Sequence, residues 1–335
     1  MKKLLILFLK FITPLLVVLL FYVWKDPFKV IWHYDSFYDS EKKISFPLNK
    51  DYVSTTTYEN QYKTEHYDSF IFGNSRSIIY GIDEWKKYIP VESKAYHFDA
   101  SAETIYGICK KIEYIDSKGE KLNNVLLIVD HMILNRAESL DGHLFVISPQ
   151  LTSYENTANF HLQFLKTFYN YKFFPGYIEY TITGKIKPYM TKATLDEEHF
   201  LYDKRTNEMR YTIVDKEIEE GKFYTPERMK VFYKRDTVQN YAPQVIKERQ
   251  KELLNTIATI FKKQGTNYKI IINPLYDQKK LNEDDIAYLI KLFGKETVYD
   301  FSGINDITND YRNYYESSHY RPQVAKKIMK EIYTQ

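Results

Sequence analysis

The sequence feature that most constrains the fold is a continuous apolar run near the middle of the chain, Asn124 to Asp130 (NVLLIVD). A strand without polar alternation is typical of a parallel sheet that is buried on both faces. Other short apolar runs alternate with segments of helical periodicity, and this alternation predicts an α/β fold with helices covering both faces of the sheet. The chain has 335 residues, of which 44% are hydrophobic, so it can bury a core of this kind.

The other expected elements follow from the same two periodicities. Strands are expected at Ser69–Phe72, Lys94–Phe98, Asn124–Asp130, Tyr268–Asn273 and Thr297–Phe301, and helices at Ile78–Tyr88, Ala102–Ile115, Pro243–Lys263, Asp284–Phe293 and Pro322–Tyr333. The alternation stops at about residues 135–241, which predicts a long insertion into an α/β domain that spans 67–335. Residues 27–66 are polar and without clear periodicity, as in a stalk or a lead-in packed on the domain.

The N-terminal segment is apolar from Leu4 to Trp24, with Lys10 and Thr13 as its distinctly polar residues and Pro14 as an interruption. Its length matches the ~20 residues that cross a bilayer. Two lysines precede it, so the positive-inside rule puts the N-terminus in the cytoplasm. Residues 1–26 are therefore predicted to be a signal anchor, a single transmembrane helix with the remaining chain outside. A cleavable signal peptide and a buried soluble helix remain as alternatives.

Charge and composition exclude several functional classes. Lys and Arg total 47 against 44 Asp and Glu, with the signs interspersed, so no basic stripe indicates nucleic acid. The single cysteine, Cys109, excludes an internal disulfide and a multi-cysteine zinc site. The histidines show neither HxH nor HExxH spacing, and only 11 residues are glycine, so neither a metal nor a phosphate-bearing cofactor is expected.

In a parallel sheet the carboxyl ends of the strands form one edge where reactive groups gather, and three groups of polar residues are candidates for that edge. They are Gly73–Ser77 (GNSRS), Asp130–His131, and Glu316–His319 (ESSH), which precedes the last helix. A serine nucleophile needs a base, and the base needs a carboxylate to orient it. Each group also has an ordinary structural interpretation: a helix-capping serine, a strand terminus, and a capping turn with a surface histidine.

Two of these groups resemble motifs of one family. The stretch FIFGNSRS looks like the first block of the SGNH/GDSL hydrolase superfamily, and ESSHYRP looks like its fifth block, with similarity in order over residues 67–131 and 268–335. The resemblance implies a flavodoxin-like three-layer fold of the SGNH type. It also implies Ser75 as nucleophile, His319 as general base and Glu316 as the carboxylate that orients it.

The family's second and third blocks have different residues here. FDASAET stands where the family has an oxyanion-hole glycine, so Ala100 or Ser101 would supply the backbone N–H. Asp130 and His131 occupy the slot of an asparagine, and His131 is the expected substitute donor, with Asp130 turned away or protonated. Asn74 and Arg76, which flank the nucleophile, are further candidates for binding the oxyanion or the substrate.

The anchor and the exported domain together resemble membrane-bound members of this superfamily, the alginate O-acetylation and teichoic acid D-alanylation proteins. This implies a bacterial cytoplasmic membrane protein with an extracytoplasmic domain, a membrane-bound O-acyltransferase as partner, and an acylated glycan or acyl donor as ligand. The predicted function is a serine acyltransferase or esterase that acts on O-acyl groups of a cell-surface polysaccharide. The alternative is a catalytically weak SGNH-like domain that binds glycan or scaffolds envelope assembly.

Tyrosines are unusually frequent in the expected insertion. Tyr154, Tyr169, Tyr171, Tyr177 and Tyr180 lie in one stretch. The pattern favours ordinary half-buried tyrosines that pack in the fold, and the alternative is glycan binding, since aromatic faces stack on sugar rings.

Overall fold

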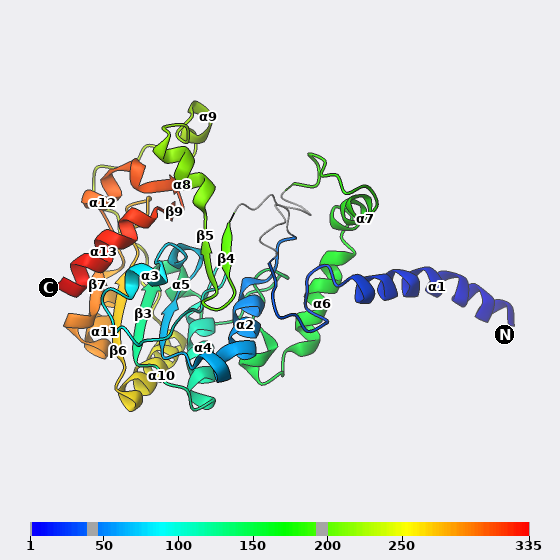
Figure 1. Cartoon of the computed structure of the whole chain (residues 1–335), viewed down its shortest axis with the longest axis horizontal. Coiled ribbons are helices and arrows are strands. Elements are labelled where there is room, and N and C mark those ends of the chain that lie inside the picture. Colours follow the sequence, from blue (N-terminus) through cyan, green and yellow to red (C-terminus); the bar gives the residue numbers. More distant parts are fainter. Residues whose placement is uncertain (1, 39–45, 192–199, 335) are drawn as a thin grey trace.

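A five-stranded parallel sheet forms the centre of the molecule (Figure 1). The computed structural model describes residues 2–38, 46–191 and 200–334. The strands are β1 (Ser69–Phe72), β2 (Ala95–His97), β3 (Asn124–Val129), β6 (Asn267–Ile272) and β7 (Val298–Asp300), in the order β2-β1-β3-β6-β7. Counting only these five strands, the order is 2-1-3-4-5, which is compatible with a flavodoxin-like fold. The predicted α/β class and its parallel sheet are confirmed.

Helices cover both faces of the sheet because side chains alternate along each strand. Phe70 and Phe72 of β1 face one layer, which contains α2 (Lys50–Glu65), α4 (Ile105–Ser117), α10 (Glu248–Gln264) and α11 (Glu283–Phe293). Ile71 of the same strand faces the other layer, with α3 (Ile82–Trp85) and α13 (Pro322–Thr334). The shorter elements near the sheet are η1 (Ser75–Ser77), α5 (His131–Asn135), η3 (Lys295–Thr297), α12 (Asp306–Asn309), η4 (Tyr311–Asn313), β8 (Tyr314–Glu316) and β9 (His319–Tyr320).

Three predicted helices are shorter than their patterns indicated. The segment expected at Ile78–Tyr88 is helical only in α3, because Gly81 has an extended backbone and caps that helix. The helix expected from Ala102 begins at Ile105, where Thr104 accepts a hydrogen bond from the Gly107 N–H. Ala102 itself has φ 52°. The helix expected from Pro243 begins at Glu248.

The lead-in at 27–66 contains a core helix that its sequence pattern did not reveal. Helix α2 buries Tyr58 in the sheet layer, together with a run of small polar residues that includes Ser54. The Ser54 hydroxyl donates to the carbonyl of Asp99 at 2.7 Å. Hydrogen bonds of this kind compensate for the burial of small polar residues such as Ser54 and Thr55, which is why no apolar periodicity marks this face, while the Tyr58 hydroxyl has no partner in the described residues. Residues 39–45 of the lead-in lie outside the described residues.

The predicted insertion between β3 and β6 has two parts. The first contains η2 (Pro149–Thr152) and the helices α6 (Thr157–Phe168) and α7 (Phe173–Thr183). The second contains the ribbon of β4 (Leu201–Asp203) and β5 (Glu208–Arg210), and then α8 (Thr212–Glu219) and α9 (Pro226–Met229). Residues 192–199 lie outside the described residues. The ribbon attaches to the α/β body through Asn207, whose side-chain amide donates to Ser54 Oγ of α2 at 2.9 Å and to the His97 carbonyl of β2 at 2.5 Å.

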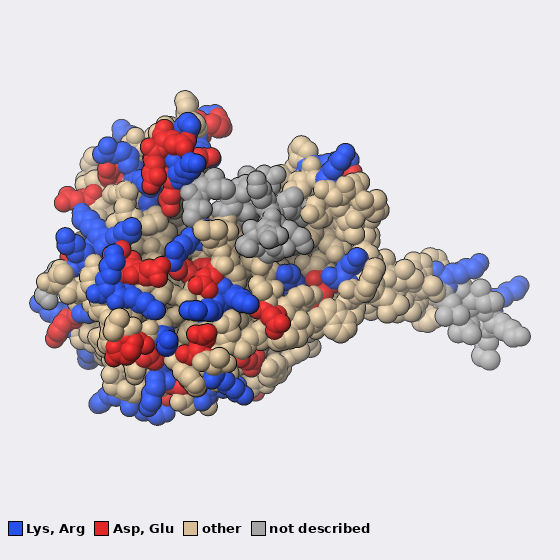
Figure 2. All heavy atoms as spheres, viewed as in Figure 1, with Lys and Arg blue, Asp and Glu red and all other residues tan. Residues whose placement is uncertain are grey.

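Helix α1 (Lys2–Lys25) projects from the rest of the molecule (Figure 1). Its C-terminal end packs through Phe21 and Tyr22 against aromatic side chains of α6 and α7, with Tyr22 and Phe168 4.8 Å apart between ring centroids. In the visible face of Figure 2, charges of both signs are mixed over the α/β body, while the surface around α1, α6 and α7 is mostly uncharged.

The predicted transmembrane helix is not supported by the structure. Within the described residues, no helix has both the length and the apolar character needed to cross a bilayer. The side chains of residues 4–6 and 9, which belong to the apolar run, lie outside the described set.

Candidate active site

Ser75 lies on a tight turn directly after β1, at the carboxyl edge of the sheet. Asn74 caps the turn: its side-chain oxygen accepts from the Arg76 N–H at 2.9 Å. Gly73 lets the turn approach β3, because a Cβ atom there would lie 2.8 Å from Ser77 Cβ and 3.0 Å from the Ile128 carbonyl oxygen. These local interactions hold the Ser75 side chain, which is half-buried, at the sheet edge.

The hairpin of β8 and β9 brings the predicted histidine and glutamate to this serine. Ser75 Oγ lies 2.8 Å from His319 Nε2, and His319 Nδ1 lies 2.5 Å from Glu316 Oε1. Ser75 and His319 are 244 residues apart in the chain. In this arrangement the Glu316 carboxylate accepts a hydrogen bond from the Nδ1–H of His319. The other ring nitrogen, Nε2, is then free to accept a proton from the Ser75 hydroxyl.

Glu316 is held as a carboxylate by its neighbours. Its second oxygen accepts from the Ser318 N–H at 2.7 Å. Burial would raise the pKa of Glu316, but the hydrogen bonds from His319 and from the Ser318 backbone outweigh burial and lower that pKa. The residue therefore remains ionised at neutral pH, as a partner that stabilises a protonated His319 must be.

Arg76 braces the nucleophile turn against the hairpin rather than facing a ligand. Its Nε donates to the Ser318 carbonyl at 2.9 Å, and its Nη2 lies 3.0 Å from Ser318 Oγ. Its Nη1 donates to Asp130 Oδ2 at 2.8 Å. The side chain is 8% exposed. Its expected role in binding the oxyanion or the substrate is therefore corrected to a positioning role.

Asp130 collects hydrogen bonds from three segments. One oxygen caps α5 through the N–H groups of Met132 and Ile133. The other accepts from Asn74 Nδ2 at 3.3 Å, and also from Arg76 and Asn273. Burial would raise the pKa of Asp130, but Arg76 and the hydrogen bonds hold that pKa below its ordinary value. The carboxylate is thus ionised and paired, and Asn74 is engaged with it inside the fold.

Two further residues of this network escaped sequence reasoning. Asn273 follows β6 at the same sheet edge, and its Nδ2 donates to Asp130 Oδ2 at 3.1 Å. The Tyr320 hydroxyl donates to Asn273 Oδ1 at 2.5 Å. The position of an asparagine directly after the apolar run Ile270–Ile272 was the available signal, since it matches that of Asp130 after its own strand.

The predicted oxyanion donors differ in whether their N–H groups already have hydrogen-bond partners. The Ala100 N–H donates to the Gly73 carbonyl at 3.3 Å, so it is already used, and the assignment of Ala100 is corrected. This contact brings the Ala100–Ser101 loop beside the Ser75 turn. The Ser101 N–H has no hydrogen-bond partner within the described residues. His131, the first residue of α5, makes no hydrogen bond to Ser75, His319 or Glu316 in the part of the chain that is described.

The tyrosines considered for glycan binding lie away from this site. Tyr177 packs face to face on Phe173 in the cluster around α1, and Tyr171 is exposed on the same side of the insertion. The pocket at Ser75 is lined instead by Tyr211 and Tyr315. Across 2–38, 46–191 and 200–334, no group of three or more His, Cys, Asp or Glu side chains could hold a metal ion.

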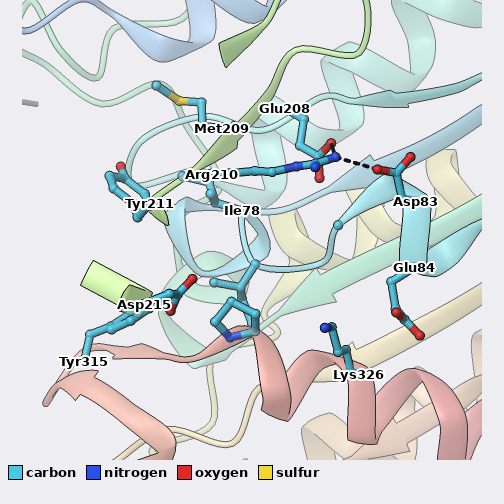
Figure 3. Close-up of a pocket in the computed structure, with 13 residues that line it drawn as sticks. Ile78, Asp83, Glu84, Glu208, Met209, Arg210, Tyr211, Asp215, Tyr315 and Lys326 are labelled. Atoms are coloured by element: carbon cyan, nitrogen blue, oxygen red, sulfur yellow. Dashed lines mark hydrogen bonds and ion pairs between the residues drawn. The ribbon is translucent and has the colours of Figure 1, made fainter. Parts of the chain in front are cut away.

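A second, charged pocket lies next to the Ser75 pocket (Figure 3). Arg210 extends across it between Asp83 and Glu208, with Nη2 2.8 Å from Asp83 Oδ2 and 2.7 Å from Glu208 Oε2. Lys326 of α13 also lines this pocket.

Comparisons of the chain with protein-family models, with curated proteins and with solved structures give no match.

Proposed function

We propose that this protein is a serine acyltransferase or esterase that acts on O-acyl groups of a cell-surface polysaccharide. The observation that carries the proposal is the unbroken chain Ser75–His319–Glu316, with contacts of 2.8 and 2.5 Å between side chains from opposite ends of the domain. The order and spacing of these residues, which resemble the SGNH superfamily, support the same function. The substrate class rests on that resemblance.

The proposed reaction proceeds by acyl transfer through Ser75. His319 Nε2 accepts the hydroxyl proton as Ser75 Oγ attacks the ester carbonyl, and the resulting oxyanion is bound by backbone N–H groups of Ser75 and Ser101. The carbon–oxygen bond to the leaving alcohol then breaks, and His319 returns the proton to that alcohol. A sugar hydroxyl or water attacks the acyl-serine by the same proton route and regenerates Ser75.

A second candidate is a catalytically weak SGNH-like domain that binds glycan or scaffolds envelope assembly. The specific observation in its favour is the use of the Ala100 N–H by the Gly73 carbonyl, which removes one oxyanion donor. The loss of one such donor typically costs about 10²–10³-fold in kcat. A measurement of covalent turnover separates the two candidates.

The test is acylation of the full-length protein by p-nitrophenyl acetate, followed by acid quenching and peptide mass spectrometry. We expect one acetyl group on the peptide that contains Ser75 and none in Ser75→Ala, because covalent catalysis requires that intermediate. Ser117→Ala is the matched control, since Ser117 is an exposed hydroxyl on α4. Equal p-nitrophenol release by Ser75→Ala and the wild type would reject the enzyme and leave the binding candidate.

We further propose that the N-terminal run attaches the protein to a bacterial cytoplasmic membrane, with the catalytic domain outside and a membrane-bound O-acyltransferase as partner. The apolar segment from Leu4 to Trp24 and the lysines before it support this placement. We expect the protein in the membrane fraction after a carbonate wash, with its domain degraded by protease added to spheroplasts. Recovery in the wash, or protection from the protease, would contradict the placement.

A further inference from the structure

The pocket that opens at Ser75 is lined almost entirely by apolar side chains. Its volume is about 400 Å³, and Ser75, Glu316 and His319 form its polar end. The other lining residues are Ile78, Ile79, Tyr211, Val214, Phe223, Arg228, Val231 and Tyr315. We propose that this pocket binds the acyl group of the substrate as an apolar chain or ring longer than acetyl. This inference rests on the proposed acyl-transfer function.

The chemistry of the lining favours the acyl part of an ester over its sugar part. A sugar hydroxyl that enters an apolar pocket without a hydrogen-bond partner loses its hydration at a net cost. The one charged side chain besides the triad, Arg228, is already engaged: its Nη1 lies 2.6 Å from Glu217 Oε2, and its guanidinium lies 4.3 Å from the Phe223 ring centroid. The pocket therefore offers apolar surface, and no free charge at Arg228 for an anionic ligand.

The neighbouring pocket differs in that charged side chains line it beside apolar ones, which indicates how an ester would be oriented. The two pockets share Ile78, Ile79, Tyr211 and Tyr315 as a common wall. Charged side chains are found on the far side of that wall, where Asp83, Arg210 and Lys326 line the second pocket (Figure 3). Most of the charged lining residues thus belong to the second pocket, and the more apolar pocket is the one that contains Ser75.

The size of the pocket excludes acetyl as the group that it fits best. Ligand pockets typically enclose a few hundred Å³ and bury most of the ligand, whereas an acetyl group would leave most of this volume empty. Each buried methylene contributes ~0.8 kcal/mol, or about fourfold in binding. Two lining residues of the pocket, Val231 and Tyr211, belong to the insertion between β3 and β6, and they are 44% and 36% exposed. The insertion therefore supplies a wall of the pocket, and this wall sets the acyl length.

The experiment measures kcat/KM of the full-length protein with p-nitrophenyl acetate, butyrate, hexanoate and octanoate. We expect kcat/KM to rise about 250-fold from acetate to hexanoate, because four more methylenes are buried at about fourfold each. Val231→Trp fills the pocket, so the hexanoate-to-acetate ratio should fall at least tenfold. Val214→Trp, on another wall, should lower the same ratio. Val238→Trp is the matched control, since Val238 is 73% exposed and outside the pocket, and its ratio should equal that of the wild type.

The possible results separate this inference from the function on which it rests. A flat or falling series with Ser75 acylated would overturn the acyl pocket and leave the acyltransferase or esterase intact. No acylation of Ser75 by any of the four esters would overturn both. A ratio that falls equally in Val231→Trp and Val238→Trp would also overturn the pocket, because the effect would then be independent of its lining.

Discussion

Ser75→Ala is expected to lower kcat for ester turnover by at least ~10⁴-fold while the protein remains folded. The loss follows from the 2.8 Å contact between Ser75 Oγ and His319 Nε2. Within the described residues, no other hydroxyl forms a hydrogen bond with His319 Nε2. The side chain is half-buried and small, so its removal should leave the far-UV circular dichroism and the thermal unfolding midpoint unchanged. The measurement is the rate of p-nitrophenol release with each variant at matched concentration.

The same chain of contacts predicts that the three triad variants are not additive. His319→Ala alone should cost about as much as Ser75→Ala, and the combination with Glu316→Gln should cost no more, because the residues act as one unit. Glu316→Gln removes the ionised partner of His319 Nδ1 and should cost about 10²–10⁴-fold. Effects that multiply across the three variants, or full activity in His319→Ala, would contradict a catalytic triad.

Lys111→Met is expected to destabilise the folded protein by about 3 to 5 kcal/mol. Lys111 is fully buried, and its ammonium contacts the carboxylates of Asp51 and Glu103, the former at 3.1 Å. Burial lowers the pKa of Lys111, but the two carboxylates outweigh burial and raise that pKa to about 12. Methionine has a similar length, so the change removes the charge more than the packing.

The pH dependence identifies charge as the cause. Burial raises the pKa of Glu103 to about 7 from 4.5, although Lys111 opposes that shift. Because the pKa of Glu103 is higher in the folded protein than in the unfolded chain, this carboxyl stabilises the folded state most when the pH is below 4.5. The stabilisation is lost as the pH rises through 7. Without Lys111, the two facing carboxylates repel each other, so the destabilisation of Lys111→Met should be largest above pH 7 and should shrink toward pH 5.

The free energy of unfolding, measured by thermal denaturation between pH 5 and pH 8, checks this prediction. Lys110→Met is the control: Lys110 lies next in the same helix but is partly exposed and pairs with Glu113, so its loss should change stability by less than about 0.5 kcal/mol. A destabilisation of Lys111→Met that is independent of pH would indicate a packing defect instead of unpaired charge.

The central sheet could be predicted because its strands carry their own signal. β3 is buried at every position and, after Asn124 at its start, apolar at every position from Val125 to Val129, as expected for a strand that is covered on both faces. Helices with one apolar face, such as α13, could also be predicted, because their apolar residues recur with the period of a helix. Helix α2 was not, because its buried face contains threonines and a serine whose hydroxyls bond to carbonyls such as that of Asp99, and such a face has no apolar period.

The sequence by itself indicated the class of the fold and the three residues of the candidate triad, because both depend on local signals: apolar periodicity for the sheet, and two motif-like stretches, FIFGNSRS and ESSHYRP, for the site. The tertiary structure decided what the polar residues beside the triad do. Asp130 and Arg76 pair with each other, and the Ala100 N–H bonds to Gly73, since each finds a partner far away in the chain. Only the packed insertion could create the apolar pocket at Ser75, because its walls come from segments that share no sequence pattern.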